Sequence, residues 1–360
     1  MNPRQTPATG QPGGALPPAT ARHAHNCPMP ARESSAPTAS VGHVPRLSVV
    51  VPCYNVDAYA ANTLISLSRN RHPDVEFILI DDASTDSTPS VLAERADRLG
   101  RVTVLTHRRN AGLAAARNTG LDAAAGKYVA FLDGDDWVEP GYYPKLLAAI
   151  EGLGCEMLRT DHVKVNGRKR VVHRITHGPR GVVMSPRSAI LPTNQATSVD
   201  APWAWAGVYH RRLADDGLLR FSDRLRTAED RPWIWRLHLQ ARSFAVVGMI
   251  GIFYRQGVAN SLTQVGDERQ LDFIDAFEQI FAELADDPDG ARFMPKAIRT
   301  YCSIINHHLS LRDRLTSTLS AHLVQRSRAS LGRLTAGEVK AAVAGMDVAR
   351  RRRLRVVLPG

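Results

Sequence analysis

The sequence is poor in cysteine and has no long hydrophobic run. Its four cysteines, Cys27, Cys53, Cys155 and Cys302, stand far apart and include no CxxC pair, so neither a disulfide framework nor a cysteine metal site is indicated. We expect free thiols, as in a reducing compartment. The longest apolar run, Phe244–Tyr254, is too short for a membrane-spanning helix, which needs about 20 residues. Hydrophobic residues at 44% and charged residues at 22% are typical of a globular protein and exclude a wholly disordered chain.

Two phosphate-binding signatures are also missing. The sequence contains no Walker A motif, and no GxGxxG follows the first predicted strand. Any phosphate group must therefore be held in another way, for instance through a metal ion.

The first 46 residues contain nine prolines and almost no large apolar side chains. Such a segment cannot bury enough surface to offset the entropy lost on ordering, so we predict that residues 1–46 are disordered. They contain no apolar stretch typical of a signal peptide. Met29 is an alternative to Met1 as the start of the natural protein.

From Leu47 onward, short apolar runs alternate with helix-like stretches. The runs are Leu47–Val51, Val75–Ile80, Val102–Leu105 and Tyr128–Leu132. The helix-like stretches between them are Tyr59–Ser68, Pro89–Leu99 and Leu113–Ala125. This alternation predicts βαβ units and a mostly parallel sheet.

Beyond residue 150 the alternation stops. Met157–Val165 and Arg168–Ile175 flank Asn166-Gly167, a pair that favours a tight hairpin turn. Further on, apolar residues recur at helical spacing: Leu271, Ile274, Phe277, Ile280 and Phe281. We therefore predict an α/β domain over residues 47–266 and a helical C-terminal extension over residues 267–360.

Acidic residues follow the predicted strands. In an open parallel sheet, ligands bind outside the carboxyl ends of the strands, and here those ends carry Asp81, Asp82 and Asp133–Asp136 (DGDD). Three carboxylates in four residues repel one another when ionised, so we expect a cation between them, and oxygen ligands suit Mg²⁺ or Mn²⁺. The alternative is a turn or a helix cap, which we favour for Asp86 and Ser87. An EF-hand loop fits poorly, because the glutamate at its twelfth position is missing.

Arg117 is a candidate helper in phosphate binding, because its stretch leads back toward the same edge of the sheet. The alternative for Arg117 is an exposed helix charge.

Six motifs, taken together, resemble those of glycosyltransferase family 2. They lie in order within residues 47–263, at the spacings usual in that family: Val51–Asn55 (VPCYN), Ile80–Asp86 (IDDASTD), Asn110–Gly120 (NAGLAAARNTG), Phe131–Asp136 (FLDGDD), Thr227–Asp230 (TAED), and Tyr254–Arg255 followed by Ser261–Thr263. The resemblance implies a Rossmann-like α/β/α sandwich of the glycosyltransferase A type. It also implies transfer of a sugar from a nucleotide-diphosphate donor to a hydroxyl acceptor, with inversion at the anomeric carbon.

The resemblance also implies roles for individual residues. Pro52, Tyr54, Asn55 and Asp82 would hold the base of the donor nucleotide, and Asp133 would lie near its ribose. Arg117, the candidate named above from its position, would join this donor site. Asp135 and Asp136 would bind the Mn²⁺ or Mg²⁺ that bridges the diphosphate. Asp230 would be the catalytic base, and Glu229 is the alternative base.

The chemistry of such a transfer agrees with these roles. A metal ion neutralises the charge that develops on the leaving diphosphate. The anomeric carbon becomes oxocarbenium-like, and one carboxylate on the opposite face removes the proton of the acceptor hydroxyl. A single displacement with one base inverts the centre.

The surroundings of Asp230 carry two further expectations. Pro232 sits comfortably only in the first turn of a helix, so Glu229 and Asp230 are predicted at a loop-to-helix junction. Four tryptophans are available either to exclude water from the site or to pack in the core: Trp203, Trp205, Trp233 and Trp235. Trp233, three residues beyond Asp230, is the candidate for stacking on a sugar.

The net charge of +11 lies in the C-terminal region. Residues 291–360 contain 14 Lys and Arg and only three acidic residues. This region therefore carries the whole net charge, and residues 1–290 together are neutral. This pattern indicates either a solvated helical face or attraction to a polyanion, namely an anionic membrane surface or an acidic glycan acceptor. Nucleic acid is disfavoured, since no recognition motif accompanies the charge. We hypothesise peripheral membrane docking near a lipid-linked acceptor.

The leading interpretation is an inverting, metal-dependent glycosyltransferase of the cytoplasm or the inner face of the plasma membrane, acting in cell-surface polysaccharide or cell-wall glycan synthesis. One alternative is a sugar nucleotidyltransferase, which would require a glycine-rich loop with Arg or Lys where Pro52–Asn55 stands. Another is a degenerate transferase-like protein that only binds glycans or membranes. The presence of Asp135, Asp136 and Asp230 argues against the last.

Overall fold

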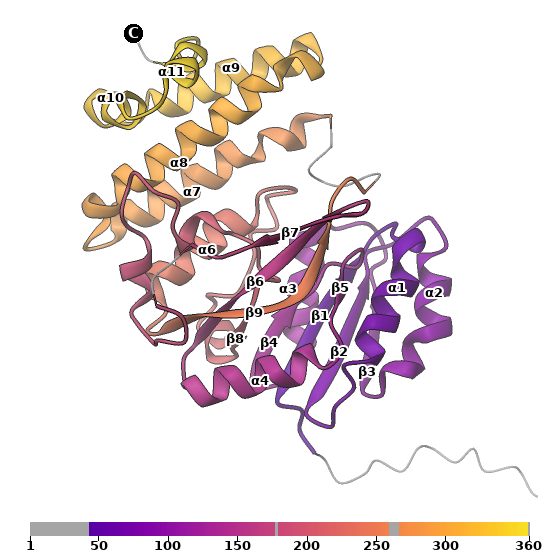
Figure 1. Ribbon diagram of the computed structural model, residues 1–360. Helices are drawn as coiled ribbons and strands as arrows, with labels where there is room; N and C mark the ends of the chain where they lie inside the picture. Colours follow the sequence, from indigo (N-terminus) through magenta and orange to yellow (C-terminus); the bar gives the residue numbers. More distant parts are fainter. Residues whose placement is uncertain (1–42, 177–178, 259–265, 359–360) are drawn as a thin grey trace, which may run out of the picture. The chain divides into compact units, whose positions relative to one another are not determined.

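The computed structural model of the chain describes residues 43–176, 179–258 and 266–358, which belong to one compact unit (Figure 1). The predicted disorder of the N-terminal segment falls outside the described residues, apart from residues 43–46. Ser261–Thr263 of the sixth motif also lie outside them.

The described residues form one nine-stranded sheet in the order β3-β2-β1-β4-β8-β6-β9-β5, with β7 paired to β6. The strands are β1 Leu47–Cys53, β2 Val75–Asp81, β3 Val102–Thr106, β4 Tyr128–Phe131, β5 Trp137–Val138, β6 Met157–Asn166, β7 Lys169–His173, β8 Gly207–His210 and β9 Phe244–Arg255. The first four predicted strands are confirmed as β1 to β4, which pair in parallel.

The directions of the strands determine which strand ends, with the polar residues that follow them, lie at the same edge of the sheet. β8 is antiparallel to both β4 and β6, so β6 runs in the same direction as β4 and β1. β9 is parallel to β6. The carboxyl ends of β1, β2, β4, β6 and β9 therefore lie along one edge of the sheet, called the carboxyl edge below.

Helices cover both faces of the sheet. On one face, Tyr143 of α4 meets the Phe77 ring of β2, and its backbone N–H donates to Asn70 at the end of α1. On the other face, α3 approaches β1 so closely that a Cβ on Gly120 would stand 2.2 Å from Val50. With both faces covered, every residue of β1 and β2 is buried, which explains their continuous apolar runs.

The α-helices are α1 Asp57–Ser68, α2 Thr88–Arg95, α3 Leu113–Ala123, α4 Tyr142–Leu153, α5 Arg212–Asp215, α6 Asp230–Gln240, α7 Asp272–Asp286, α8 Gly290–Ser310, α9 Ser317–Leu331, α10 Ala336–Ala344 and α11 Val348–Leu354. Short 3₁₀ helices are η1 Ala96–Leu99, η2 Pro186–Ala189, η3 Ser198–Asp200, η5 Glu268–Leu271 and η6 Arg312–Arg314. The predicted α/β/α sandwich with a helical C-terminal extension is confirmed.

Two local predictions are confirmed as well. β6 and β7 form the hairpin expected around Asn166-Gly167, with Gly167 at a positive φ of 56°. The helical spacing near residue 271 belongs to α7, whose buried face includes Ile274, Phe277 and Ile280. Among the described residues, no helix is long and apolar enough to cross a membrane.

Candidate active site at the carboxyl edge

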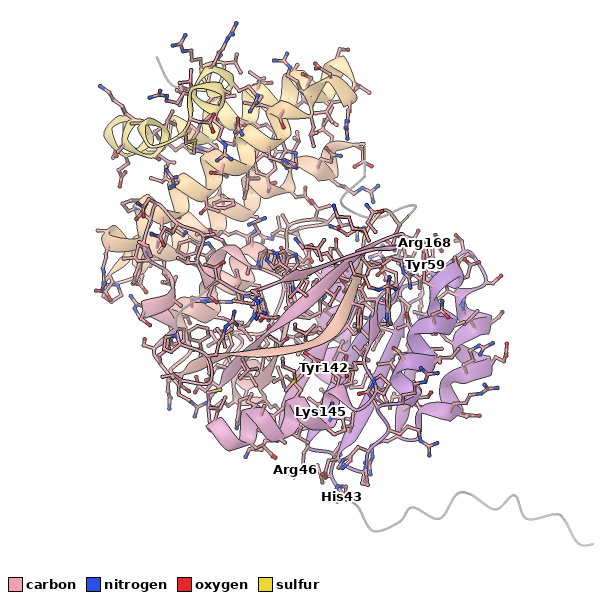
Figure 2. All side chains as sticks on the ribbon, in the orientation of Figure 1. His43, Arg46, Tyr59, Tyr142, Lys145 and Arg168 are labelled. Carbon is pink, nitrogen blue, oxygen red and sulfur yellow. The ribbon has the colours of Figure 1, made fainter. Side chains whose placement is uncertain are left out.

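Figure 2 marks the two ends of the parallel strands: Arg46 precedes β1, and Tyr59 lies in α1 beyond the carboxyl end of β1. The residues predicted to form the site lie at the Tyr59 end. They follow β1 (Tyr54 and Asn55), β2 (Asp82) and β4 (Asp133 to Asp136), or come from α3 (Arg117) and the start of α6 (Asp230).

The loops after β1 and β2 hold each other through Asn55. Its side-chain Oδ1 accepts from the Thr85 backbone N–H at 2.8 Å, and its own N–H donates to Ser84 Oγ at 3.1 Å. Asn55 adopts a left-handed φ of 50°, which asparagine tolerates. The neighbouring Tyr54 is left 46% exposed. Pro52 is buried, and its carbonyl accepts from the Gly134 N–H at 3.1 Å.

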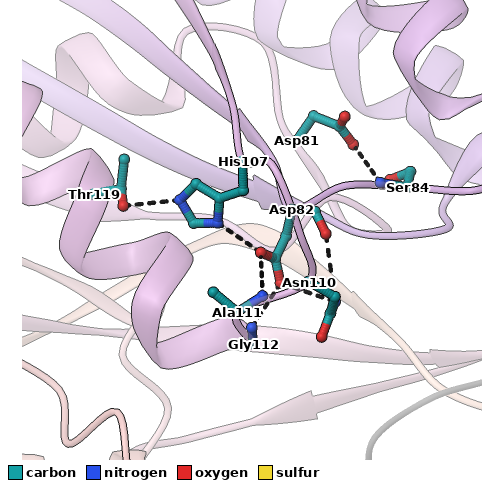
Figure 3. Close-up of polar contacts among 8 residues, drawn as sticks. All are labelled: Asp81, Asp82, Ser84, His107, Asn110, Ala111, Gly112 and Thr119. Carbon is teal, nitrogen blue, oxygen red and sulfur yellow. Dashed lines mark hydrogen bonds and ion pairs between the residues drawn. The ribbon is translucent and has the colours of Figure 1, made fainter.

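Asp82 organises the loop that leads into α3 (Figure 3). One carboxylate oxygen contacts His107 Nδ1 at 2.6 Å and accepts from the Ala111 N–H, and the other accepts from Gly112 N–H and Asn110 Nδ2. Each oxygen thus has two protein partners. The side chain of Asp82 therefore positions residues 107–112.

Asp86 caps α2, as predicted. Its Oδ1 accepts from the Thr88 backbone N–H at 2.9 Å, and its Oδ2 accepts from Asp57 N–H at the start of α1. Ser87 occupies the N-cap position without a side-chain cap bond.

Arg117 is the buried centre of the site. It is 3% exposed, so the alternative of an exposed helix charge is wrong. Its guanidinium donates to Asp133 Oδ1 at 2.9 Å and to Glu229 Oε1 at 2.8 Å, and it lies 5.1 Å from the centre of the Phe221 ring. One cation therefore joins the end of β4 to the start of α6.

Glu229 and Asp230 lie at the predicted loop-to-helix junction. Asp230 is the first residue of α6, Pro232 lies in its first turn, and Ala228 has a left-handed φ of 57°. Burial raises the pKa of Glu229 to about 7, against the lowering effect of Arg117. Burial also raises the pKa of Asp230, against the lowering effects of Arg231 and Arg117. Carboxylates with raised pKa values are suited to accept protons near neutral pH.

The DGDD turn after β4 packs tightly against β1. A Cβ on Gly134 would stand 2.8 Å from Cys53 Sγ, so this position requires glycine. Burial, followed by the charge of Asp133, raises the pKa of Asp135 to about 6. Asp136 is fully buried, and burial followed by the charge of Asp135 raises its pKa well above the usual range.

Arg255 at the end of β9 closes this turn. Its backbone N–H donates to Asp136 Oδ1 at 2.6 Å, and its Nε donates to the Asp135 carbonyl. Its guanidinium lies over the rings of Tyr59 and Trp137. Asp136 Oδ2 is buried and has no hydrogen-bond partner.

The donor set of the DGDD turn fits a hard cation that is only partly held by protein. Across residues 43–176, 179–258 and 266–358, no three His, Cys, Asp or Glu side chains form a group that could hold a metal ion. Mg²⁺ commonly uses one or two carboxylates and takes its other ligands from water and substrate phosphates. The half-buried Asp135 and the unpartnered oxygen of Asp136 match that pattern.

The tryptophans divide into two groups. Trp233 and Trp235 are buried; Trp233 stacks on Phe221, and its indole N–H donates to the Leu219 carbonyl. The alternative of core packing is therefore confirmed for Trp233, and sugar stacking by Trp233 is wrong, because its side chain is fully buried. Trp203 is half-buried and packs with Trp205, which in turn contacts Tyr254.

His162 of β6 lies beneath these tryptophans. It is fully buried, with ring centres 4.9 Å from Trp203 and 4.7 Å from Trp205, and neither ring nitrogen has a hydrogen-bond partner. Burial, followed by the charges of His173 and Lys164, lowers its pKa to about 3. The imidazole is therefore neutral at physiological pH.

Replacing His162 with phenylalanine should stabilise the protein more at pH 5 than at pH 8. Below pH 6.5 an unfolded histidine gains a proton that folded His162 does not take up until pH approaches 3, so the free energy of unfolding falls as pH falls through this window. At pH 5 the wild-type protein loses about 2 kcal/mol of its free energy of unfolding in this way, and the phenylalanine variant does not lose it. Urea unfolding of both proteins at the two pH values measures the difference. If the substitution changed the free energy of unfolding equally at pH 5 and pH 8, the imidazole of His162 would not be neutral in the folded protein.

Three site contacts were missed from the sequence: His107 on Asp82, Arg255 on Asp136, and Glu229 on Arg117. Tyr254-Arg255 belongs to a motif, but nothing in it indicates a backbone bond to Asp136. The Arg117–Glu229 contact joins residues 112 positions apart. The only feature of the sequence that pointed to this contact was the presence of Glu229 as a second acid beside Asp230.

Known proteins resemble this chain in sequence and fold. Residues 48–214 match the family model described as glycosyl transferase family 2. EpsJ of Bacillus subtilis, described as an uncharacterized glycosyltransferase, is 28% identical over 229 residues, covering 64% of this chain and 66% of EpsJ. TuaG of the same organism, a putative teichuronic acid biosynthesis glycosyltransferase, is 42% identical over 138 residues, covering 38% of this chain and 55% of TuaG.

A solved structure of Staphylococcus aureus TarS in complex with UDP-GlcNAc matches with a TM-score of 0.67 at 19% identity, covering 85% of this chain and 89% of that chain. This likeness agrees with the sheet and helix arrangement described above. For the first three curated relatives, the match covers between 15% and 66% of the relative's own length, which is less than two thirds in each case.

Proposed function

Because the chain belongs to glycosyltransferase family 2, we propose that it transfers a sugar from a nucleotide-diphosphate donor to a hydroxyl acceptor, with inversion at the anomeric carbon. The observation that carries this proposal is the set of carboxylates around Arg117 at the carboxyl edge. Asp133 and Glu229 pair with Arg117, and the pKa of Asp230 is raised by burial. Such a group of perturbed acids is typical of an active site.

The donor nucleotide would lie across the ends of β1 and β2. Tyr54 offers an exposed ring to the base beside Pro52 and Asn55, and Asp82 holds the loop 107–112 on the other side. Asp133 retains partial exposure beside Arg117, which suits contact with the ribose. One structural match contains UDP-GlcNAc, so UDP is the first nucleotide to test.

Asp135 and Asp136 would hold a Mn²⁺ or Mg²⁺ ion together with the diphosphate. A cation there would neutralise the charge that develops on the leaving group. Asp230 would accept the proton of the acceptor hydroxyl as that oxygen attacks the anomeric carbon on the face opposite the diphosphate. Arg117 would hold Asp133 and Glu229 in place during this displacement.

The acceptor would belong to a cell-surface polysaccharide or a cell-wall glycan made at the cytoplasmic side of the membrane. The printed names of three relatives support this: TuaG (teichuronic acid), TarS (poly(ribitol-phosphate)) and ExoO (succinoglycan).

Thermal unfolding with UDP, GDP and dTDP, each with Mn²⁺ or EDTA, tests the donor site. We expect one nucleotide to raise stability only with metal, by about 2.7 kcal/mol at a hundredfold excess over its Kd. Asp135→Asn should abolish the part of the nucleotide-induced stabilisation that depends on metal. If no nucleotide shifts the thermal unfolding transition, the result favours the alternative of a degenerate protein that only binds glycans or membranes. Release of pyrophosphate from NTP and sugar phosphate would favour a nucleotidyltransferase.

The C-terminal helix α11 would contact an anionic membrane surface. Val348 is 70% exposed, and helical spacing places it on one face of α11 with Arg351 and Arg352, while the exposed Arg355 and Val356 follow directly after the helix. An apolar face edged with arginines is typical of interfacial binding.

Vesicle sedimentation with phosphatidylglycerol tests this surface. At about 1 kcal/mol per cation, R351Q/R352Q/R355Q should weaken binding on the order of 100-fold. A matched control is R71Q/R98Q/R101Q, which removes three exposed arginines elsewhere and should bind as wild type. Equal binding by both variants would remove α11 from the proposal.

A further inference from the structure

The β6–β7 hairpin carries a one-sided positive charge. Residues 162–199 contain seven Lys and Arg and no Asp or Glu. Three of the seven form ion pairs: Arg174 and Arg180 share Asp161, and Arg187 pairs with Asp287. In the part of the chain that the structure describes, no carboxylate forms an ion pair with the other four: Lys164, Arg168, Lys169 and Arg170.

The hairpin turn lies at the carboxyl edge. β6 runs parallel to β9, so its end at Asn166 lies on the same side as Arg255, the residue that bonds Asp136. Figure 2 places Arg168 at the same end of the molecule as Tyr59, whose ring contacts the Arg255 guanidinium. The unpaired cations therefore border the carboxylates of the proposed transfer site.

Two rings of the hairpin, His162 of β6 and His173 of β7, form a cluster with Trp203, Trp205 and Tyr254, called the aromatic platform here. The ring centre of His162 lies 4.7–4.9 Å from those of His173, Trp203 and Trp205. The ring centre of Trp205 lies 5.2 Å from that of Tyr254. Trp203, His173 and Tyr254 are only half-buried.

The two ends of the platform differ in charge. At the inner end, Tyr254 directly precedes Arg255, whose backbone N–H bonds Asp136, and burial, followed by the charges of Asp136, Asp133 and Asp135, raises the pKa of Tyr254 to about 12. At the outer end, Lys164 Nζ lies 4.9 Å from the centre of the Trp203 ring. The platform thus runs from a proton-accepting end to a cationic end.

The platform also has polar groups that the protein does not satisfy. Both ring nitrogens of the fully buried His162 lack a partner, and such buried orphans in a folded protein call for an explanation by a ligand or water. Burial lowers the pKa of His173 as well, which favours its neutral form, so the half-buried His173 can offer a hydrogen bond without adding charge.

We propose that the aromatic platform and the β6–β7 hairpin form the acceptor subsite, and that the acceptor is a glycan carrying negative charge as uronate or phosphate groups. Sugar rings stack on the half-buried Trp203, while Lys164 and the cations of the hairpin, Arg168, Lys169 and Arg170, pair with the anionic groups. This inference rests on the proposed function, because it takes the site carboxylates as the place of transfer. Cations on the edge strand β7 also discourage edge-to-edge pairing, but that role does not account for Lys164, which is half-buried against Trp203.

Calorimetric titration of the full chain with defined oligomers tests the subsite. The probes are tetragalacturonic acid, its uncharged methyl ester and a tetramer of glycerol phosphate, which separate carboxylate, neutral sugar and phosphate. We expect at least one charged oligomer to bind ten or more times more tightly than the ester. R168Q/K169Q/R170Q should weaken that binding tenfold or more, whereas the matched control R71Q/R98Q/R101Q, at the opposite edge of the sheet, should change it less than twofold.

Two single variants separate the parts of the subsite. K164Q should remove most of the preference for charge and leave ester binding unchanged, while W203A should weaken binding of charged and neutral sugar oligomers alike. K164Q changes a half-buried lysine, so it keeps the test informative if W203A does not fold.

The proposal is overturned if no charged oligomer binds, if the ester binds as tightly as both charged oligomers, or if both triple variants weaken binding equally. None of these titrations requires a donor or turnover. Oligomer binding without any nucleotide-dependent thermal shift would therefore leave the subsite standing while the proposed transfer fails.

Discussion

Replacing Asp230 with asparagine is expected to lower the kcat of donor turnover about 10²–10⁴-fold, the range that general-base catalysis contributes. Asparagine keeps the size of the side chain at the start of α6 but cannot accept a proton. The donor KM should change little, because the nucleotide lies on the β1–β2 side of Arg117. Release of nucleoside diphosphate, with the donor whose nucleotide gives the largest thermal shift, measures both constants.

The neighbouring acid supplies the matched control. Glu229 accepts from Arg117 at 2.8 Å and is 5% exposed, whereas Asp230 is more exposed. Glu229→Gln should therefore lower kcat less than Asp230→Asn does. It should lower the free energy of unfolding more than Asp230→Asn does. A larger loss of kcat in Glu229→Gln, with Asp230→Asn still active, would reverse the two roles.

The part of the fold that followed from the sequence is the part in which local pattern decides structure. β1 to β4 are apolar runs buried on both faces, and alternation with helices specifies parallel pairing. β8 and β5 carried no such signal, because four and two residues are too short for a readable period. β9 stood out in the sequence only as the apolar run Phe244–Tyr254. Its place between β6 and β5 depends on pairing with two strands that lie far earlier in the chain.

The candidate site shows the same division. Acids at strand ends are visible in the sequence, because topology brings strand ends to one edge. Their partners are not visible: Asp82 meets His107 across 25 residues, and Asp136 meets the backbone of Arg255 across 119. The basic hairpin was hidden by the sum over residues 1–290, in which the acids of other segments balance its cations.

Arg117→Met is expected to destabilise the protein by about 3–5 kcal/mol at pH 8, the cost of removing one partner of a buried ion pair. The methionine fills much of the same volume beside Phe221, so the loss comes mainly from charge. Without the guanidinium, Glu229 is left as an unpaired carboxylate at 5% exposure. The pKa of Glu229, already raised to about 7 by burial, should rise further, so the variant should recover stability as pH falls below that value.

A double variant separates charge from packing. If the cost of Arg117→Met arises from the stranded carboxylate, adding Glu229→Gln should recover stability at pH 8, and the two changes should couple in a double-mutant cycle. Arg98→Met, at an exposed position without an ion pair, should stay within about 0.5 kcal/mol of wild type. Denaturant unfolding of the five proteins (wild type, Arg117→Met, Glu229→Gln, their double variant and Arg98→Met) at pH 6 and pH 8 gives the free energy of unfolding of each. Additive effects, with a cost that does not change with pH, would show that Arg117 stabilises the carboxyl edge by packing against Phe221 and not by holding Asp133 and Glu229 together.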